Sequence, residues 1–145
     1  MELTDFINKW IGTKIDFDGH YGAQCVDLFR EYCKDVLHIP HTGLVEGAKD
    51  IYLKFDQMPR EKWYFDRIPF GDSIEMKLGD VIVWDKTQTN EYGHVALFIS
   101  KVDNEKVLVF EQDGFRQDGA KLNLRKTENI LGVLRYKDKG ANDGR

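Results

Sequence analysis

The sequence offers one cysteine in a position suited to nucleophilic chemistry. Cys25 follows a glycine-containing loop and begins an apolar stripe with the spacing of one helix face. At a helix N-terminus, unpaired backbone N–H groups and the helix dipole favour the thiolate, which is the nucleophilic form of cysteine. The alternative is a small core residue at the end of the stripe, because free cysteine is often buried. Cys33, further along the same stripe, is interpreted as a core residue.

A thiol nucleophile needs a base, and His94 is the candidate among the four histidines. It begins the most apolar strand-like segment of the chain, where a ring is held on a rigid element. Glu111 ends another such segment and shares a strand face with Val107 and Val109, so its carboxylate requires a polar partner. A carboxylate that holds one imidazole N–H leaves the other ring nitrogen to take the thiol proton. The pattern therefore predicts a Cys-His-Glu site, with a structural histidine and a glutamate that points at water as the alternatives.

The loop before Cys25 has the ligand spacing of a calcium-binding loop. The candidate ligands are carboxylates at positions 1, 3 and 12 and backbone carbonyls at positions 5 and 7, namely Asp16, Asp18, Asp27, His20 and Gly22. The loop departs from an EF-hand because Tyr21 replaces the glycine at position 6 and position 12 is aspartate instead of glutamate. An Asx-turn followed by an acidic residue in the first helical turn is the alternative.

These residues lie at the ends of predicted secondary-structure elements. Apolar residues at helical spacing predict helices over residues 3–11, 24–37 and 45–55, followed by an irregular aromatic stretch over residues 63–70. β-Branched and aromatic runs then predict strands near residues 80–84, 94–99, 107–111 and 132–136. Helices followed by strands indicate an α+β fold, in which N-terminal helices pack on an antiparallel β-sheet.

The two cysteines are expected to be free thiols. Both lie on the apolar stripe of one predicted helix, eight residues apart. Eight residues of helix rise by about 12 Å, whereas a disulfide requires Cα atoms within about 7 Å of each other. The helix therefore predicts that no bridge joins Cys25 to Cys33.

Composition restricts the class of protein. The chain has 145 residues, a net charge of -4 and 41% hydrophobic residues, which suffices for the core of one domain. Scattered charges and a pI near 5.6 argue against a nucleic-acid partner. We find no apolar stretch near the roughly 18 residues of a membrane span, and no basic and apolar start typical of an export signal. Residues 137–145 are almost without apolar side chains and are expected to be a flexible tail or linker after a domain of residues 1–136.

At these positions the sequence resembles the CHAP family, the cysteine, histidine-dependent amidohydrolase/peptidase domains of phage endolysins and bacterial wall hydrolases. The matching segments are residues 16–27 with the Gln-Cys pair, residues 79–84, residues 92–96 with the Gly-His pair, and residues 110–114. The resemblance implies a papain-like α+β fold, with Cys25 as nucleophile, His94 as base and Glu111 as the residue that orients the base.

The same resemblance implies further site residues. The Gln24 side chain and the Cys25 backbone N–H would form the oxyanion hole, and the acidic loop would bind calcium, as it does in a subset of phage members. Asp113 is a departure, because phage members often carry asparagine two residues after the catalytic glutamate. As a further candidate catalytic residue, its carboxylate would raise the pKa of His94; alternatively, it would face solvent.

The function implied by the resemblance is that of a peptidoglycan hydrolase. It would cleave an amide bond in bacterial cell-wall peptides, as an endopeptidase or an N-acetylmuramoyl-L-alanine amidase. The alternatives are an acyltransferase or transpeptidase with the same nucleophile, and a non-catalytic, calcium-dependent wall-binding module with Trp63, Tyr64 and Phe65 as a stacking surface.

The expected partner is bacterial peptidoglycan, bound by a monomer that is linked to a separate wall-binding domain. No organic cofactor, nucleic acid or membrane is expected as a partner. The protein would act at the bacterial cell wall. Before lysis it would lie in the host cytoplasm, in a virion tail or within a larger protein.

Overall fold

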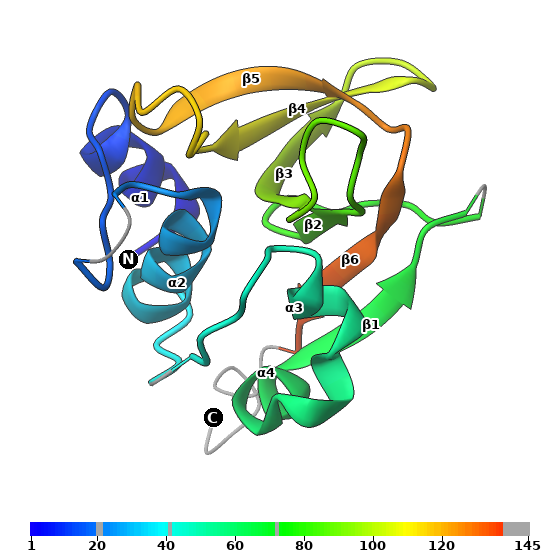
Figure 1. The fold of residues 1–145 in the computed structure, drawn as a ribbon, viewed down its shortest axis with the longest axis horizontal. Helices are drawn as coiled ribbons and strands as arrows, with labels where there is room; N and C mark the ends of the chain where they lie inside the picture. Colours follow the sequence, from blue (N-terminus) through cyan, green and yellow to red (C-terminus); the bar gives the residue numbers. More distant parts are fainter. Residues whose placement is uncertain (20–21, 41, 72, 138–145) are drawn as a thin grey trace.

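The computed structural model describes residues 1–19, 22–40, 42–71 and 73–137 (Figure 1). Two predictions lie outside these residues: His20 as a calcium ligand, and the tail beyond Lys137. The helices are α1 (Leu3–Trp10), α2 (Cys25–Asp35), α3 (Asp50–Leu53), the 3₁₀ helix η1 (Phe55–Gln57) and α4 (Pro59–Tyr64). The strands are β1 (Phe65–Pro69), β2 (Val81–Trp84), β3 (His94–Lys101), β4 (Lys106–Glu111), β5 (Lys121–Lys126) and β6 (Ile130–Tyr136).

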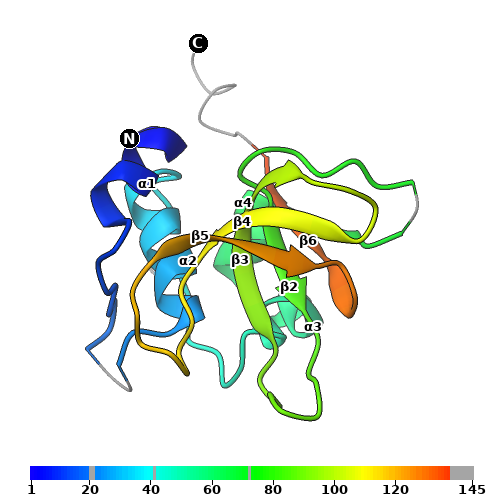
Figure 2. The ribbon, with the colours of Figure 1, turned by 90° about the horizontal axis from the view of Figure 1, so that it is seen from above.

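The strands form one sheet in the order β1-β6-β2-β3-β4-β5, and each neighbouring pair is antiparallel. Helices α1 and α2 lie together on one side of this sheet, whereas α3 and α4 lie near β1 and β6 (Figures 1 and 2). The arrangement confirms the predicted α+β fold with helices packed on an antiparallel sheet. In the part of the chain that the structure describes, every helix is too short or too polar to cross a membrane.

Helix α2 begins at Cys25 because its first turn is capped. Asp27 Oδ2 accepts a hydrogen bond of 2.8 Å from the backbone N–H of Gln24, and these two residues form a capping box. The buried side chains of the helix pack in the core against β3 and include Leu28, Phe29, Tyr32 and Cys33. Burial of this face fixes the start of α2, and with it Cys25, relative to the sheet.

Both faces of the central strands are buried, which explains their continuous apolar sequences. The core on the helix side contains Val81, Val83, Val95, Leu97 and Phe110. A second apolar cluster contains Ile82, Trp84, Ala96, Phe98, Val107 and Val109. Because successive side chains of a strand point to opposite faces, His94 and Glu111 continue the rows of this second cluster at the ends of β3 and β4.

The helix predicted over residues 45–55 is wrong in extent. Only α3 and η1 form there, and the backbone just before α3 also bonds across to the loop between β2 and β3. The Lys49 N–H donates to the Tyr92 carbonyl at 2.9 Å. A Cβ on the buried Gly47 would lie 2.8 Å from the same oxygen, so glycine permits this close approach.

The stretch over residues 63–70 is also more regular than predicted. Pro59 occupies the first turn of α4, a position that needs no backbone N–H, and the helix ends at Tyr64. Strand β1 follows directly and pairs with β6, which begins at Ile130, two residues before the predicted start. Pairing with a distant strand stabilises β1, and no local pattern reveals that partner.

Strand β5 is an edge strand that the hydrophobic pattern does not predict. Its apolar residues, Leu122 and Leu124, are 44% and 53% exposed, and the residues between and around them are polar. It forms because its whole length pairs with β4, from Lys121 opposite Glu111 to Lys126 opposite Lys106. The alternation of the strand gives it one polar row on the same face as Glu111.

Candidate active site

His94 and Glu111 meet where two neighbouring strands end. His94 is the first residue of β3 and Glu111 is the last residue of β4. The His94 Nε2 atom lies 2.9 Å from Glu111 Oε1, in a site where Glu111 is fully buried and His94 is 9% exposed. The hydrogen bond places the proton on Nε2, because a carboxylate only accepts. Nδ1 is therefore the ring nitrogen left to exchange a proton.

Two neighbours fix the imidazole in this orientation. Gly93 has a φ of +75°, and a Cβ at this position would collide with the Trp84 carbonyl oxygen, so the tight turn before His94 requires glycine. The rings of Trp84 and His94 lie in contact, with centroids 5.6 Å apart. The indole is held in turn, because Trp84 Nε1–H donates to the Lys126 carbonyl at 3.0 Å. The Gly-His pair of the sequence thus corresponds to a turn that aims the ring.

Cys25 approaches this pair from the first position of α2. It is half-buried, and its thiol is a hydrogen-bond partner of His94. Burial by itself would lower the pKa of His94, but the interactions with Cys25 and Glu111 raise this pKa from 6.5 to about 9. As the first helical residue, Cys25 also has a backbone N–H without a carbonyl partner inside the helix. The structure therefore brings Cys25, His94 and Glu111 together.

Cys33 is confirmed as a core residue, and both cysteines are free, as their spacing predicted. The Cys33 side chain is fully buried, and this burial raises the pKa of its thiol well above the ordinary value. A neutral, inaccessible thiol is a poor nucleophile. The two thiols of α2 thus differ in environment as strongly as their positions in the helix suggested.

Glu111 is held as an anion by two residues of β5 that sequence analysis missed. Arg125 donates from Nε to Oε1 at 2.6 Å and from Nη2 to Oε2 at 2.9 Å, and Asn123 donates from Nδ2 to Oε2 at 2.9 Å. Burial would raise the pKa of Glu111, but the hydrogen bonds from His94 and Arg125 lower it from 4.5 to about 2. The sequence shows that polar residues alternate along β5. This alternation does not reveal that Asn123 and Arg125 lie on the same face of the sheet as Glu111.

Gln112 links the segment before Cys25 to the end of β4. Its fully buried amide accepts the Ile15 N–H at 2.7 Å and donates to the Ile15 carbonyl at 2.7 Å and the Gln24 carbonyl at 2.9 Å. Gln112 directly follows Glu111, and Gln24 directly precedes Cys25. One side chain therefore couples the position of the thiol to that of the carboxylate. No pattern in the sequence singles out Gln112.

The two remaining predicted catalytic residues are placed differently. Gln24 is the N-cap of α2, next to the Cys25 backbone, and its side chain packs on Gly114, where an added Cβ would lie 3.3 Å from Gln24 Cγ. Asp113 is directed into the turn after β4: its Oδ1 accepts the Phe115 N–H at 2.8 Å, and its Oδ2 lies 3.7 Å from Arg116 Nε. These contacts give Asp113 a role in the turn. The groups that act on the pKa of His94 are Cys25 and Glu111.

Three of the predicted calcium ligands converge. Carboxylate oxygens of Asp16, Asp18 and Asp27 all lie within 4.8 Å of one another. Burial raises the pKa of Asp27 to about 6, and the charges of Asp18 and Asp16 add to this rise. Arg30 offers only partial compensation, since its Nη1 lies 3.7 Å from Asp18 Oδ2. Converging carboxylates with excess negative charge fit a hard cation that prefers oxygen ligands.

Gly22, the other described member of the predicted calcium loop, lies against Gln117. A Cβ on Gly22 would lie 3.0 Å from Gln117 Oε1. The Gln117 amide accepts the Ala23 N–H at 3.1 Å and donates to the Ala23 and Gly114 carbonyls at 2.8 Å. Gln117 is thus a second glutamine that ties the segment before Cys25 to the segment after β4.

Comparison with known protein families decides where this arrangement belongs. The family model described as the CHAP domain matches residues 14–113, which include Cys25, His94 and Glu111. The chain belongs to the CHAP domain family. The endolysin PlyTW of Staphylococcus phage Twort is 29% identical over 118 residues, which cover 77% of this chain and 23% of the relative. The D-alanyl-L-alanine endopeptidase of Streptococcus phage B30 is 31% identical over 93 residues, which cover 61% of this chain and 19% of the relative.

Solved structures share the fold of this CHAP domain. The wild-type endolysin LysIME-EF1 superposes with a TM-score of 0.63 at 21% identity, over 97% of this chain and 67% of that chain. Ly7917, solved with the hydrolyzing product of MDP, superposes with a TM-score of 0.66 at 15% identity, over 91% of this chain and 60% of that chain. These likenesses confirm the CHAP fold. The chain spans only about a fifth of the length of the curated relatives.

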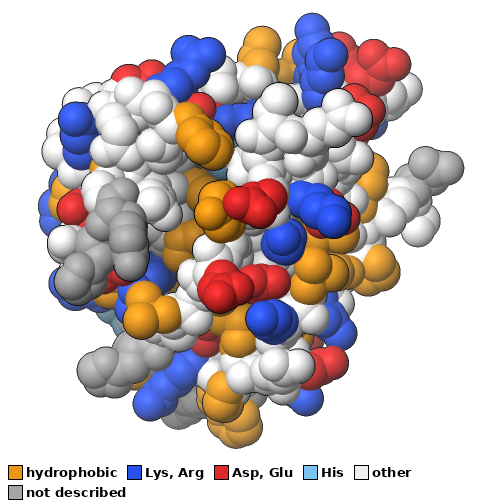
Figure 3. All heavy atoms as spheres, viewed as in Figure 1, with side chains coloured by type: hydrophobic (Ala, Val, Ile, Leu, Met, Phe, Trp, Pro, Cys, Tyr) orange, Lys and Arg blue, Asp and Glu red, His pale blue; other side chains and the backbone are white. Residues whose placement is uncertain are grey.

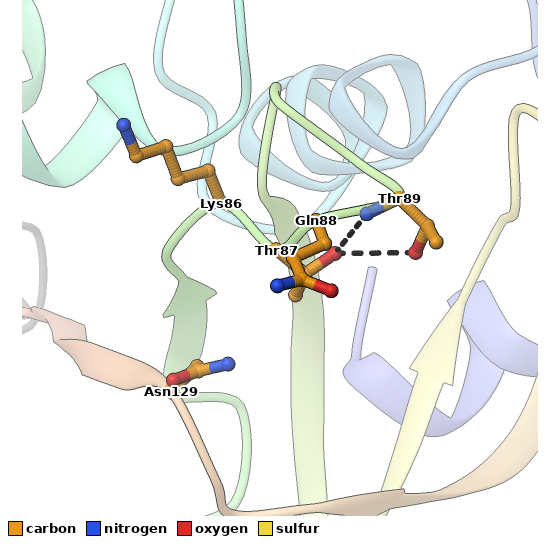
Figure 4. Close-up of a pocket in the computed structure, with 5 residues that line it drawn as sticks. All are labelled: Lys86, Thr87, Gln88, Thr89 and Asn129. Atoms are coloured by element: carbon orange, nitrogen blue, oxygen red, sulfur yellow. Dashed lines mark hydrogen bonds between the residues drawn. The ribbon is translucent and has the colours of Figure 1, made fainter.

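The surface of this CHAP domain is hollowed beside the His94–Glu111 pair. A groove of about 440 Å³ is lined by Trp84, Asn123, Arg125 and neighbouring residues that are mostly polar. An adjoining hollow of about 730 Å³ is lined by Lys86, Thr87, Gln88, Thr89 and Asn129 (Figure 4). Thr87 and Asn129 line both, so the two hollows adjoin and lead from Arg125 to the loop between β2 and β3.

The charges on this CHAP domain are mixed in sign. Figure 3 shows acidic and basic side chains interspersed on the face that is viewed in Figure 1, which agrees with the small net charge of -4. A surface of this kind exerts little long-range attraction on a charged polymer.

Proposed function

We propose that this CHAP domain is a peptidoglycan hydrolase that cleaves an amide bond in bacterial cell-wall peptides through a Cys25 acyl-enzyme. The observation that carries the proposal is the buried His94–Glu111 pair beside a cysteine at the first position of a helix. Two relatives are named as a phage endolysin and a D-alanyl-L-alanine endopeptidase, which supports a cell-wall peptide as the substrate and an endopeptidase as the type of enzyme.

In this mechanism, each proposed catalytic group has one task. His94 Nδ1 takes the proton of the Cys25 thiol, and the sulfur attacks the carbonyl carbon of the scissile amide. Glu111 holds Nε2–H and stabilises the imidazolium. The Cys25 backbone N–H and the Gln24 side chain donate hydrogen bonds to the oxyanion.

Collapse of the tetrahedral intermediate breaks the C–N bond, and His94 passes the proton to the leaving amine. Water, deprotonated by His94, then attacks the thioester and releases the carboxylic acid and the free thiol. The groove lined by Trp84 and Arg125, which contact His94 and Glu111, gives a wall peptide a place to bind near the proposed catalytic pair. Both half-reactions use the same imidazole, so the proposal requires His94 to act as acid and base in turn.

The decisive experiment digests defined muropeptides and identifies the products by mass spectrometry. We expect the mass of one water to be added across a single amide bond, with a D-alanyl-L-alanine bond in the cross-bridge as the first candidate. Cleavage between muramic acid and L-alanine would assign an N-acetylmuramoyl-L-alanine amidase instead. Products that carry an added amine in place of water would assign an acyltransferase or transpeptidase. Intact substrates in all of these assays, with a folded protein, would contradict the proposal.

The non-catalytic alternative, a wall-binding module, would bind through a stacking surface of three neighbouring aromatic residues. Of the three aromatic residues proposed for stacking, Trp63 is 62% exposed, Tyr64 is half-buried and Phe65 lies in the core at 1% exposure. Phe65 packs against Phe29 and Tyr136, with ring centroids 6.2 Å apart in each pair. The three rings therefore do not form one platform, and the enzymatic function is favoured.

We also propose that Asp16, Asp18 and Asp27 hold a calcium ion, with backbone carbonyls of His20 and Gly22 as further ligands. Bound calcium would neutralise the three carboxylates and stabilise the loop that precedes α2. Asp27 connects this loop to the nucleophile, because its Oδ2 accepts the N–H of Gln24, the residue before Cys25. The role assigned to the metal is therefore structural.

Removal of calcium is expected to lower both wall lysis and thermal stability. EDTA should reduce the lysis rate and lower the melting temperature by several degrees, and added calcium should restore both. Asp16→Asn and Asp27→Asn should weaken these responses, since an asparagine oxygen still accepts hydrogen bonds but carries no charge. Asp66→Asn, at an exposed position of β1, is the matched control and should respond as wild type does. An unchanged melting temperature and lysis rate in EDTA would refute the calcium proposal.

Residues 1–136 are proposed as the catalytic unit, acting at the cell wall together with a separate wall-binding domain. A chain with a net charge of -4 gains no electrostatic attraction to an anionic wall. The proposed wall-binding domain would supply the affinity for the wall. Both relatives are phage proteins and one is named as an endolysin, which supports an endolysin as the kind of protein.

A further inference from the structure

The guanidinium group of Arg125 lies where it can control the His94–Glu111 pair. Arg125 on β5 is opposite Val107 of β4, so its side chain runs along the sheet to reach Glu111. It contacts both carboxylate oxygens, at 2.6 Å from Nε to Oε1 and 2.9 Å from Nη2 to Oε2. Asn123, two residues earlier on the same strand face, adds a bond of 2.9 Å to Oε2. Together with His94, these donors make four hydrogen bonds to one buried carboxylate.

We propose that Arg125 is a positioning residue, whose planar guanidinium sets the orientation of the Glu111 carboxylate so that Oε1 meets His94 Nε2. A guanidinium that binds a carboxylate through two parallel hydrogen bonds fixes the plane of that carboxylate. Lysine supplies a charge of the same sign without this orientation. The proposal rests on the proposed Cys-His-Glu mechanism and adds to it a residue that acts through Glu111.

Burial makes the orientation of Glu111 dependent on its protein partners. A fully buried carboxylate is not hydrated by bulk water, and an unpaired buried charge lowers the stability of the folded protein. Without Arg125, His94 and Asn123 are the donors to Glu111 that remain among the described residues. The carboxyl group would then rotate toward other partners or become protonated. Either change removes the acceptor that holds Nε2–H, and with it the tautomer that leaves Nδ1 free for the thiol.

A purely electrostatic role for Arg125 predicts the opposite effect on His94. The groups that act on the imidazole are Cys25 of α2 and Glu111 of β4. Arg125 of β5 binds Glu111, and Asp113 in the turn after β4 interacts with Arg125. If Arg125 only contributed positive charge, its removal would raise the pKa of His94, because a nearby cation disfavours the imidazolium. If Arg125 positions Glu111, its removal lowers this pKa, because the imidazolium loses its acceptor.

The test compares Arg125→Gln and Arg125→Lys with a matched control, Arg135→Gln. Arg135 on β6 makes the same two-pronged contact with the buried Asp80, at 3.0 Å from Nε to Oδ1 and 2.7 Å from Nη2 to Oδ2. It contacts neither His94 nor Glu111. All three variants lose one two-pronged arginine–carboxylate pair, so an effect of lost stability alone should be similar in all three. The measurements are kcat and KM on a soluble muropeptide and the titration of His94 by NMR.

We expect Arg125→Gln to lower kcat by roughly 100-fold with little change in KM, which is the size of effect that a small misplacement of a catalytic group produces. The pKa of His94 should fall in this variant, and Arg125→Lys should change kcat and this pKa in the same direction. Millimolar guanidinium should restore part of kcat in Arg125→Gln. Arg135→Gln should keep the wild-type kcat and the wild-type titration of His94.

Two results would overturn the proposal. One is an unchanged or raised pKa of His94 in a folded Arg125 variant, and the other is a wild-type kcat in Arg125→Lys. If Arg125→Gln fails to fold, Arg125→Lys still decides through both measurements. The NMR titration needs no turnover, so it tests the placement of Glu111 even in a protein without hydrolase activity. Failure of this proposal is thereby distinguished from failure of the proposed function.

Discussion

Cys25→Ala is expected to abolish lysis of susceptible walls, with a fall in kcat on the order of 10⁶-fold, because the variant has no atom that can form the acyl-enzyme. The fold should survive, since Cys25 is only half-buried at the start of α2 and alanine is compatible with a helix. Lysis is measured as the loss of turbidity of purified walls, and folding by circular dichroism.

Cys33→Ala is the matched control, because it removes the other thiol of the same helix from a fully buried site. It should keep full activity at a small cost in stability. In the wild-type protein, iodoacetamide should inactivate the enzyme and label Cys25, and Cys33 should react only after unfolding. Lysis by a folded Cys25→Ala protein, or inactivation that follows labelling of Cys33, would exclude Cys25 as the nucleophile.

The proposed base and its partner could be found in the sequence because of where they stand in their strands. β3 and β4 have side chains buried on both faces, so each reads as an apolar run in which a polar residue at the end is conspicuous. His94 and Glu111 occupy those ends, and an antiparallel pairing places the start of one strand beside the end of the other. A local pattern therefore sufficed to predict a contact between residues 17 positions apart.

Arg125 and Asn123 could not be found in this way, because their role depends on a pairing that no local pattern specifies. In an edge strand with exposed leucines, charged and amide side chains look like an ordinary solvated surface. Only the register of β5 on β4, with Asn123 opposite Val109, shows that these side chains face Glu111. Gln112 escaped for a related reason, since its partners Ile15 and Gln24 lie about ninety residues earlier in the chain.

The calcium loop shows a different limit of sequence-based prediction. The spacing of Asp16, Asp18 and Asp27 correctly indicated that their carboxylates converge. They converge because the loop leads directly into the capped first turn of α2. Spacing could not show that Asp27 also accepts a hydrogen bond from the backbone of Gln24. That bond connects the candidate metal site to the nucleophile, and it makes calcium dependence a test of how the start of α2 is held.

His94→Ala is expected to lower kcat by roughly 10³-fold or more, because both the proton of the Cys25 thiol and the proton of the leaving amine pass through this ring. Glu111 should remain ionised in this variant, since Arg125 and Asn123 still donate to it. The fold is thus expected to persist. His38→Asn is the control: His38 is exposed after α2 with a φ of +56°, a conformation that asparagine tolerates. Wild-type lysis by His94→Ala would exclude His94 as the base.

The same variant should remove a pH dependence of stability. The pKa of His94 is raised from 6.5 to about 9 in the folded protein. The contribution of His94 to the free energy of unfolding is therefore fully present below pH 6.5 and is lost as the pH rises through about 9. A shift of this size corresponds to about 3 kcal/mol. The lowered pKa of Glu111 has its effect at acidic pH. The contribution of Glu111 to the free energy of unfolding is present above pH 4.5 and is lost as the pH falls through about 2.

Urea unfolding at pH 6 and pH 9.5 measures the alkaline effect. Between these pH values, the wild-type protein should lose up to about 3 kcal/mol more of its free energy of unfolding than His94→Ala loses. Its kcat/KM should fall over the same range, because a neutral imidazole cannot protonate the leaving amine. If wild type and His94→Ala lost equal stability, the imidazolium would not be held by Glu111 and Cys25, and the proposed role of Glu111 in stabilising the imidazolium would lose its basis.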